Sequence, residues 1–258
     1  MTRPWSAPEP EANGALVRVL VVVPTYCEAD NIVTLLNRVR AAIPAADILV
    51  VDDSSEDGTA ALAGSVGEEL GQIRVLHHGA KQGLGAAYRS GFAYGIARDY
   101  DVLIEMDADL SHDPAALPLL LEALDRGADL AIGSRYVHGA DIPAWTARRR
   151  ALSKYGNRYA SRMLTLAPSD LTSGYRAFRS SALIDADYAT SRATGYAFQI
   201  ELARRVAKAG GSISEVPIVF HDRNTGTSKM STRITVEALA LVTWWGIQDR
   251  WRRLRPSR

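Results

Sequence analysis

Two aspartates two positions apart follow an apolar run in residues 102–113, VLIEMDADLSHD, and their spacing suits metal chemistry. In a strand, side chains at i and i+2 point the same way, so Asp107 and Asp109 are expected to converge on one ion where the chain leaves the sheet. Mg²⁺ or Mn²⁺ fits such a pair, because these cations are commonly held by carboxylates together with nucleotide phosphates. The alternative is an aspartate-rich turn in which Asp113 caps a helix beginning at Pro114. That role suits Asp113 and leaves the first two aspartates for the metal.

The elements that must position this pair follow from the alternation of short β-rich runs and amphipathic segments between Val17 and about Ser134. This alternation predicts parallel strands with crossover helices, and the strands are continuously apolar because helices cover both faces. Ligands of such sheets bind outside the carboxyl ends of the strands. The motifs PTYCE, DDSSEDGT and DAD follow three predicted strands, so we expect them at one edge of an α/β nucleotide-binding sheet.

Helices are expected near 29–42, 57–70, 83–98 and 114–126 in the first half, and near 148–166 and 196–209 in a second half that is helical and rich in loops. No linker rich in Pro, Gly or Ser separates the halves. We therefore predict one continuous domain over 16–232, with a nucleotide-binding half at about 16–135 and an acceptor-side half at about 136–232. Residues 1–15 are expected to form a mobile tail, and 233–258 an amphipathic helix.

Composition narrows the class of partner. The chain has 258 residues with 30 basic and 29 acidic side chains, and this near balance gives no bulk electrostatic reason to expect nucleic acid. Cys27 is the only cysteine, which excludes an intramolecular disulfide and fits a reducing compartment; we expect a buried, inert thiol. The apolar stretch 234–247 contains Glu237 and is shorter than the roughly 20 residues of a spanning helix, so no transmembrane helix is predicted.

The first two motifs have side chains suited to a nucleoside. Pro24 lacks an N–H and ends its strand, while Tyr26 can stack on a base and Glu28 can accept hydrogen bonds. At the end of the second strand, Asp52 or Asp53 is expected to accept ribose hydroxyls or base N–H groups.

The segment GAKQGLGAAYRSG contains Gly83-x-Gly85 but has Tyr88 where a dinucleotide fingerprint has its third glycine, which argues against a dehydrogenase. Two interpretations of the turn stay open. It either approaches a diphosphate, with Lys81 as a cation, or simply begins a helix.

Basic side chains of the second half are the next candidates. Arg135 follows the fifth predicted strand, Arg149 begins a helix, and Arg223 and Lys229 lie in the loop HDRNTGTSK. Arginine binds phosphate with two parallel hydrogen bonds, so these four residues predict a phosphate-binding set. Arg148 and Arg150 are interpreted as a solvated helix face.

The last helix combines Trp244, Trp245 and Trp251 with several arginines. This composition is typical of a helix in a membrane interface, and packing on the protein's own core is the alternative.

Taken in order from about residue 18 to 232, the motifs resemble those of the polyprenyl-phosphate (dolichyl-phosphate type) mannose synthases of inverting glycosyltransferase family 2. The motifs that carry the resemblance are PTYCEADN, VDDSSEDGT, KQGLGAAYRSGF, MDADLSHDP, GSRY, RRRALSKYGN, DLTSGYRAF and VPIVFHDRNTGTSKM. The resemblance implies an A-type glycosyltransferase fold, a GDP-mannose donor, Mg²⁺ or Mn²⁺, and a polyprenyl phosphate acceptor at the cytoplasmic face of the cell membrane. The enzyme would then be cytoplasmic and peripheral on that membrane.

The resemblance also assigns roles to residues. It implies nucleoside contacts by Pro24, Tyr26, Glu28 and Asp52 or Asp53, diphosphate and metal contacts by Asp107, Ala108 and Asp109, and phosphate contacts by Arg135, Arg149, Arg223 and Lys229. Two positions depart from the family pattern. Cys27 stands where relatives have Asn, and Ser111 stands where some have Gln beside the metal, so either the Ser111 hydroxyl or water is expected as a ligand. Some relatives have C-terminal transmembrane helices, so this chain is expected to rely on its last helix or on an integral membrane protein partner.

Two competing functions remain. One is transfer of glucose from UDP-glucose to the same lipid, or of a sugar to a saccharide, for which Asp170 is the candidate base. The other is a nucleotide-binding subunit without catalysis that recruits a membrane partner.

Overall fold

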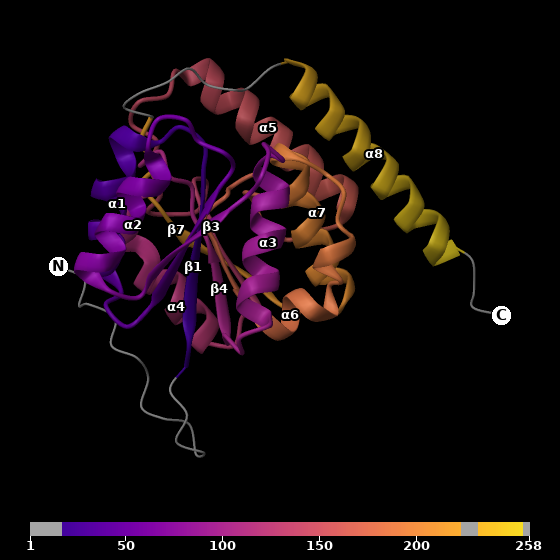
Figure 1. The fold of residues 1–258 in the computed structure, drawn as a ribbon. Helices are drawn as coiled ribbons and strands as arrows, with labels where there is room; N and C mark the ends of the chain where they lie inside the picture. Colours follow the sequence, from indigo (N-terminus) through magenta and orange to yellow (C-terminus); the bar gives the residue numbers. More distant parts are fainter. Residues whose placement is uncertain (1–16, 223–231, 255–258) are drawn as a thin grey trace.

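The computed structural model describes residues 17–222 and 232–254, with side chains described for 17–222 and 236–251. The predicted tail 1–15 and the residues Arg223 and Lys229 lie outside the described residues. Within them, helices cover both faces of a seven-stranded sheet with the order β3-β2-β1-β4-β6-β5-β7 (Figure 1). The predicted α/β fold is confirmed.

The strands of the nucleotide half pair in parallel, as their apolar runs predicted. The wholly buried β1 is central because its neighbours cover both of its edges and helices cover both of its faces. The strands are β1 (Val19–Thr25), β2 (Asp47–Asp52), β3 (Ile73–His77), β4 (Val102–Glu105), β5 (Leu130–Ser134), β6 (Arg176–Arg179) and β7 (Ile213–Pro217).

One strand of the sheet was not predicted. The segment TSGYRAF supplies β6, which lies between β4 and β5 and runs antiparallel to both. The pairing of Ile104 with Ala177 joins the acceptor half to the nucleotide half inside one sheet. A four-residue strand carries little periodic signal, so the sequence did not indicate this insertion.

The helices form two layers with separate apolar cores. One core packs the side chains of α1, α2 and α4 on the sheet, and the other packs those of α3, α5, α6, α7 and α8 (Figure 1). The helices are α1 (Ala29–Ala42), α2 (Thr59–Leu70), α3 (Leu84–Ile96), α4 (Leu117–Asp125), α5 (Ala147–Leu164), α6 (Ser180–Asp185), α7 (Gly195–Lys208) and α8 (Thr232–Leu254), with 3₁₀ turns η1 (Pro114–Ala116) and η2 (Tyr188–Thr190). Asp113 caps η1 by accepting a hydrogen bond from the N–H of Ala115, as predicted.

The last helix packs on the protein along one side, which is one of the two predicted roles. One side of α8 packs on α5 and α7 through buried Val242 and through Asp249, which accepts hydrogen bonds from Arg204. The other side leaves Trp244 and Trp251 exposed. Within the described part of the chain, no helix has the length and apolarity needed to cross a bilayer.

Candidate active site

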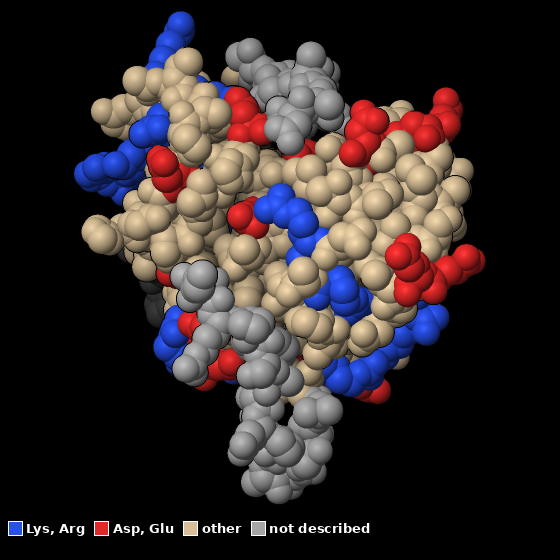
Figure 2. All heavy atoms as spheres, turned by 90° about the vertical axis from the view of Figure 1, so that its left-hand side faces the viewer, with Lys and Arg blue, Asp and Glu red and all other residues tan. Residues whose placement is uncertain are grey.

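A pocket of about 520 Å³ opens where the polar motifs follow the strands. It brings together eleven of the residues selected from the sequence. These are Pro24, Tyr26, Glu28, Asp53, Lys81, Asp107, Ala108, Asp109, Ser111, Arg135 and Arg149. The molecular face in Figure 2 carries interspersed acidic and basic side chains, in keeping with the formal charge of +1.

Asp107 and Asp109 line the same pocket, but they do not lie in a strand. β4 ends at Glu105, so Asp107 and Asp109 lie in the following loop, where Leu110 has a left-handed φ of 59°. Oδ1 of Asp107 accepts a 3.1 Å hydrogen bond from the phenol of Tyr88. The two aspartates therefore share one pocket, and the local structure that places them there is a turn rather than the predicted strand end.

Asp109 is oriented by the serine two residues later. Its Oδ1 accepts hydrogen bonds from the hydroxyl of Ser111 at 2.6 Å and from the N–H of the same residue at 3.0 Å. The Ser111 side chain therefore fixes the direction of the carboxylate, a role that the sequence did not suggest.

The donor set fits a hard divalent cation. Two carboxylates and a hydroxyl border one pocket, and oxygen is the ligand that Mg²⁺ and Mn²⁺ prefer. Among the described residues, no three His, Cys, Asp or Glu side chains are grouped closely enough to hold a metal by themselves. Remaining coordination positions would fall to substrate phosphates and water, which is how Mg²⁺ is usually bound with nucleotides.

The two adjacent aspartates after β2 have different surroundings. Asp52 is buried, bonds to the hydroxyl of Thr25 at 2.8 Å and to the N–H of Ser55, and does not line the pocket. Asp53 lines it, and its carboxylate accepts hydrogen bonds from the N–H groups of Gln82 and Gly83 at 2.8 and 2.7 Å. Of the pair, Asp53 is thus the better placed to contact a nucleotide.

The same contacts limit what the backbone of the glycine turn can bind. Burial acts to raise the pKa of Asp53, but the two backbone N–H groups and His78 hold it below its ordinary value. The turn before α3 therefore uses these two N–H groups to fix a carboxylate of the pocket. These two N–H groups are therefore not available as donors to a diphosphate.

Lys81 and Cys27 complete this side of the pocket. The ammonium of Lys81 lies 3.3 Å from the ring centre of Tyr26, a cation–π contact. Cys27 is exposed and has φ 58°, so the expectation of a buried thiol is wrong. Its N–H donates to the hydroxyl of Ser55, and this turn at the end of β1 directs the side chain outward.

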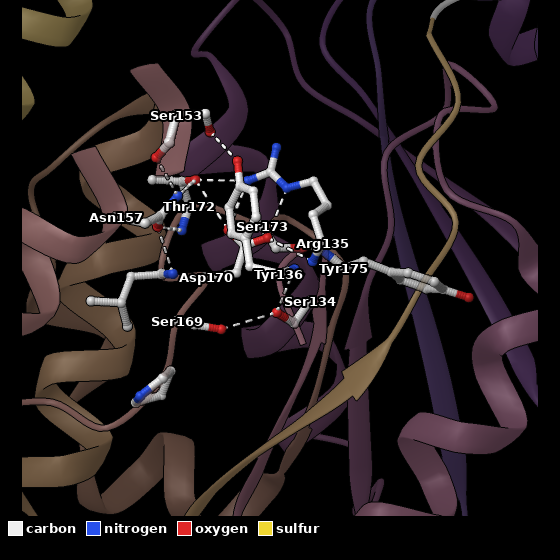
Figure 3. Close-up of polar contacts among 12 residues, drawn as sticks. Ser134, Arg135, Tyr136, Ser153, Asn157, Ser169, Asp170, Thr172, Ser173 and Tyr175 are labelled. Carbon is white, nitrogen blue, oxygen red and sulfur yellow. Dashed lines mark hydrogen bonds and ion pairs between the residues drawn. The ribbon is translucent and has the colours of Figure 1, made fainter. Parts of the chain in front are cut away.

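Arg135 follows β5 directly and forms a buried ion pair with Asp170 (Figure 3). Its Nε and Nη2 each donate to the carboxylate of Asp170 at 2.7 Å, and Nη2 also donates to the hydroxyl of Thr172. Burial acts to raise the pKa of Asp170, yet the adjacent guanidinium outweighs it and holds that pKa below the ordinary value. The pair keeps a cationic group at the pocket wall in one orientation.

The surroundings of Asp170 exclude one predicted role. This carboxylate is fully buried, is held by Arg135, and does not line the pocket. A base must reach the proton that it removes, so Asp170 as the base for a saccharide acceptor is wrong. Asn157 of α5 supports the same loop by accepting the N–H of Leu171 at 2.8 Å (Figure 3).

The second pocket arginine forms an ion pair that is partly exposed to solvent. Arg149 begins α5, where the hydroxyl of Thr146 caps its N–H. Its guanidinium lies 4.2 Å from the ring centre of Trp145 and bonds to both carboxylate oxygens of Asp222 at 3.1 Å. Both partners of this pair are partly exposed, so the pair exchanges more easily than the buried pair at Arg135.

Among the residues that the sequence did not assign to the site, three matter most for its geometry. Tyr88 was noted only as a departure from a fingerprint, Gln199 only lay within a predicted helix, and Trp145 was not considered. All three line the pocket or bond to residues that do. Their positions depend on pairing between distant segments, so their own sequence neighbourhoods carried no signal beyond residue type.

The fold defines the class of protein: a glycosyltransferase of the A-type fold. The chain belongs to glycosyltransferase family 2, because residues 20–186 match the model of the family described as glycosyl transferase family 2.

Two relatives are similar over nearly the whole chain. The undecaprenyl-phosphate mannosyltransferase of Micrococcus luteus is 47% identical over 93% of this chain and 98% of its own. The polyprenol monophosphomannose synthase of Mycolicibacterium smegmatis is 47% identical over 92% of this chain and 90% of its own. The resemblance read from the motifs is thereby confirmed.

The fold likeness extends to more distant enzymes. The structure of glucosyl-3-phosphoglycerate synthase from Mycobacterium tuberculosis in complex with Mn²⁺ and UDP-glucose superposes with a TM-score of 0.63. It is 20% identical and covers 96% of this chain and 84% of its own, a level of identity that shows the fold alone.

Proposed function

We propose that this chain transfers mannose from GDP-mannose to a polyprenyl monophosphate, with inversion at the anomeric carbon and with a bound Mg²⁺ or Mn²⁺. The observation that carries the proposal is one pocket with an acidic wall, Asp107 and Asp109, and a basic wall, Arg135 and Arg149. Such a pocket has groups for two anionic substrates. The 47% identity to two enzymes named for polyprenyl or undecaprenyl phosphate mannose transfer supports the choice of acceptor and sugar.

The donor would lie along the acidic wall. Tyr26, Glu28 and Asp53 would contact the nucleoside, and Lys81 would move from the Tyr26 ring toward the diphosphate. Asp107 and Asp109 would hold the cation, with Ala108 beside the diphosphate and Ser111 orienting the second carboxylate. When bound, the cation neutralises charge that develops on the departing diphosphate.

The acceptor phosphate would lie against the basic wall. At neutral pH a phosphate monoester carries about −1.5 to −2 charges, so its oxygen attacks without a strong general base. That oxygen forms a bond to the anomeric carbon while the bond from this carbon to the diphosphate oxygen breaks, and GDP leaves. Because Asp170 already fixes Arg135, the guanidinium is aligned before the phosphate arrives. This alignment lowers the cost of reorganisation during the reaction.

Arg149 would complete the acceptor site. Its partner Asp222 is exposed, so a phosphate can replace that carboxylate at a small cost. Arg223 and Lys229 belong to the same proposed set. Residues 16–232 then form one catalytic domain in which the acceptor half supplies the cations.

Association with the cytoplasmic face of the cell membrane follows from a lipid acceptor. Leu152 and Tyr155 on α5 and Trp244 and Trp251 on α8 are exposed, and the two helices pack against each other. Aromatic rings beside arginines are typical of a helix surface that contacts a bilayer interface. An integral membrane protein partner would bind this same surface.

The test is transfer of radiolabelled mannose from GDP-mannose to purified polyprenyl phosphate, extracted into organic solvent, with and without EDTA. We expect a lipid-linked β-mannosyl product that disappears with EDTA and returns with Mg²⁺ or Mn²⁺. UDP-glucose is assayed in parallel. Preference for that donor, or a product made equally well in EDTA, would overturn the proposal.

A further inference from the structure

Gln199 is a buried amide inside the pocket that has no hydrogen-bond partner among the described residues. It lies on α7 near the start of the helix and is 2% exposed. It lines the same pocket as the acidic wall, Asp107 and Asp109. Neither its side-chain oxygen nor its side-chain nitrogen makes a hydrogen bond. Leaving a buried polar group without a partner costs about 1–3 kcal/mol, so such a group in a substrate pocket calls for an explanation.

The position of the amide is fixed by its surroundings. The backbone carbonyl of Gln199 accepts a 2.7 Å hydrogen bond from the buried guanidinium of Arg176. The neighbouring Phe198 stacks on Tyr88, whose phenol holds Asp107. The segment of α7 that carries the amide therefore packs against Tyr88, the residue that positions Asp107.

Gln199 and Asp107 border one gap in that wall. The residue between them is Gly174, and a Cβ added there would lie 3.4 Å from Oδ2 of Asp107 and 3.7 Å from Nε2 of Gln199. A glycine leaves this gap without a side chain. A group bound next to the Asp107 carboxylate would therefore meet the amide.

The nearest internal candidate for a partner is Glu105. The amide lies close enough to lower the pKa of this fully buried carboxyl, against the stronger effect of burial, yet it forms no hydrogen bond of good geometry with it. Glu105 does not line the pocket, whereas Gln199 does. An amide has two N–H donors and an oxygen acceptor, so a contact with Glu105 still leaves one donor and the acceptor for a bound substrate.

We propose that Gln199 recognises one hydroxyl group of the donor sugar and so determines which sugar the pocket accepts. This inference rests on the proposed mannosyl transfer. A carboxamide both donates and accepts, as a hydroxyl does, whereas an ionised phosphate only accepts. The sugar is attached to the diphosphate, and the amide lies beside the carboxylate assigned to that end of the donor. A buried polar group that hydrogen-bonds a substrate hydroxyl rejects an analogue lacking it, because the group is then left unpaired.

The experiment compares GDP-mannose with four GDP-mannose analogues, deoxygenated in turn at carbons 2, 3, 4 and 6 of the sugar. Each donor is assayed with polyprenyl phosphate for the wild type and for Gln199→Met, which keeps the length of the side chain and removes its hydrogen bonds. We expect kcat/KM of the wild type to fall by roughly 10- to 100-fold for one analogue because of the amide. For each analogue we compare the ratio of kcat/KM with GDP-mannose to kcat/KM with the analogue. In Gln199→Met the ratio for that one analogue should approach 1, while the ratios for the other three stay as in the wild type.

The matched control is Gln248→Met, a glutamine on α8 outside the pocket, which should change none of the ratios. Thermal unfolding identifies a misfolded variant. In that event Gln199→Glu, which keeps the size and the oxygen acceptors, must change the ratio at a single position. A loss of equal size for all five donors would overturn the inference, because it indicates a role in positioning alone. Absence of transfer by the wild type would instead refute the proposed function.

Discussion

The phenol of Tyr88 on α3 donates a 3.1 Å hydrogen bond to Oδ1 of Asp107 in the loop after β4. Tyr88 is fully buried and stacks on Phe92 and Phe198. Burial and the nearby carboxylates raise the pKa of this phenol well above its ordinary value, so it stays protonated and remains a donor. The helix that precedes β4 thus holds one of the two carboxylates of the acidic motif in place.

Removing this hydroxyl gives the first prediction. Tyr88→Phe keeps the ring stack and frees Asp107, so we expect the concentration of Mg²⁺ or Mn²⁺ giving half-maximal activity to rise by about 10-fold or more, as for other groups that orient metal ligands. The free energy of unfolding should fall by only about 1 kcal/mol. Metal titration of activity and urea denaturation measure the two effects. An unchanged metal requirement would contradict the assigned role.

The acidic pair gives the second prediction. Asp109→Ala should nearly abolish transfer, because the cation loses one of its carboxylate ligands. The matched control is Asp113→Asn in the same loop, where the carboxylate caps η1 and bonds to the partly exposed Arg38. That variant keeps a capping side chain and loses only the partly exposed ion pair with Arg38, so it should lose less than about 1 kcal/mol of stability and keep its activity. Comparable activity of the two variants would show that the acidic pair is not the metal site.

The two ion pairs of the basic wall should differ in their contribution to stability. Asp170→Asn leaves the buried guanidinium of Arg135 without its counter-charge and should lower the free energy of unfolding by about 3–5 kcal/mol. Asp222→Asn breaks the exposed pair with Arg149 and should cost less than about 1 kcal/mol. Urea denaturation of the two variants compares them directly. Equal losses in the free energy of unfolding would show that burial does not determine how much each ion pair contributes to stability.

Glu105 gives a prediction on pH. Burial raises its pKa from 4.5 to about 8, despite the proximity of Arg176. Between these two values the folded protein keeps the proton while the unfolded chain releases it. The unfolded state then binds fewer protons, so Glu105 contributes a fall in stability as pH rises through this window.

Glu105→Gln should remove this contribution. The free energy of unfolding of the wild type minus that of the variant is measured by urea denaturation at several values between about pH 5 and pH 8. We expect this difference to decrease by at least about 1 kcal/mol as the pH rises. A difference that stays constant over the window would mean that Glu105 ionises with its ordinary pKa.

The exposed tryptophans of α8 give the last prediction. The double variant Trp244→Ala and Trp251→Ala should bind vesicles containing anionic lipid several-fold more weakly, because both side chains are exposed and would enter the bilayer interface. The control is Leu62→Ala on α2, an exposed apolar residue on the opposite layer. Sedimentation with vesicles measures binding. Equal binding by the two variants would assign the membrane contact to another surface.

The sequence by itself determined the sheet and much of the pocket. Continuous apolar runs such as β1 can be buried only as central strands, and helices cover the faces of such a sheet. Parallel strands bring their carboxyl ends to one edge, so Tyr26, Asp53 and Asp109 could be assigned to one site from their order alone.

The tertiary structure decided which polar groups in that site are already bonded. It inserted β6 antiparallel between β4 and β5, buried Asp170 against Arg135, and exposed Cys27. It also brought Tyr88 to Asp107 and left the amide of Gln199 without an internal partner. The physical reason is that periodicity reports only which face of an element is apolar. Hydrogen bonds between distant segments depend on distances of a few ångströms, and these are fixed only once the whole chain has packed.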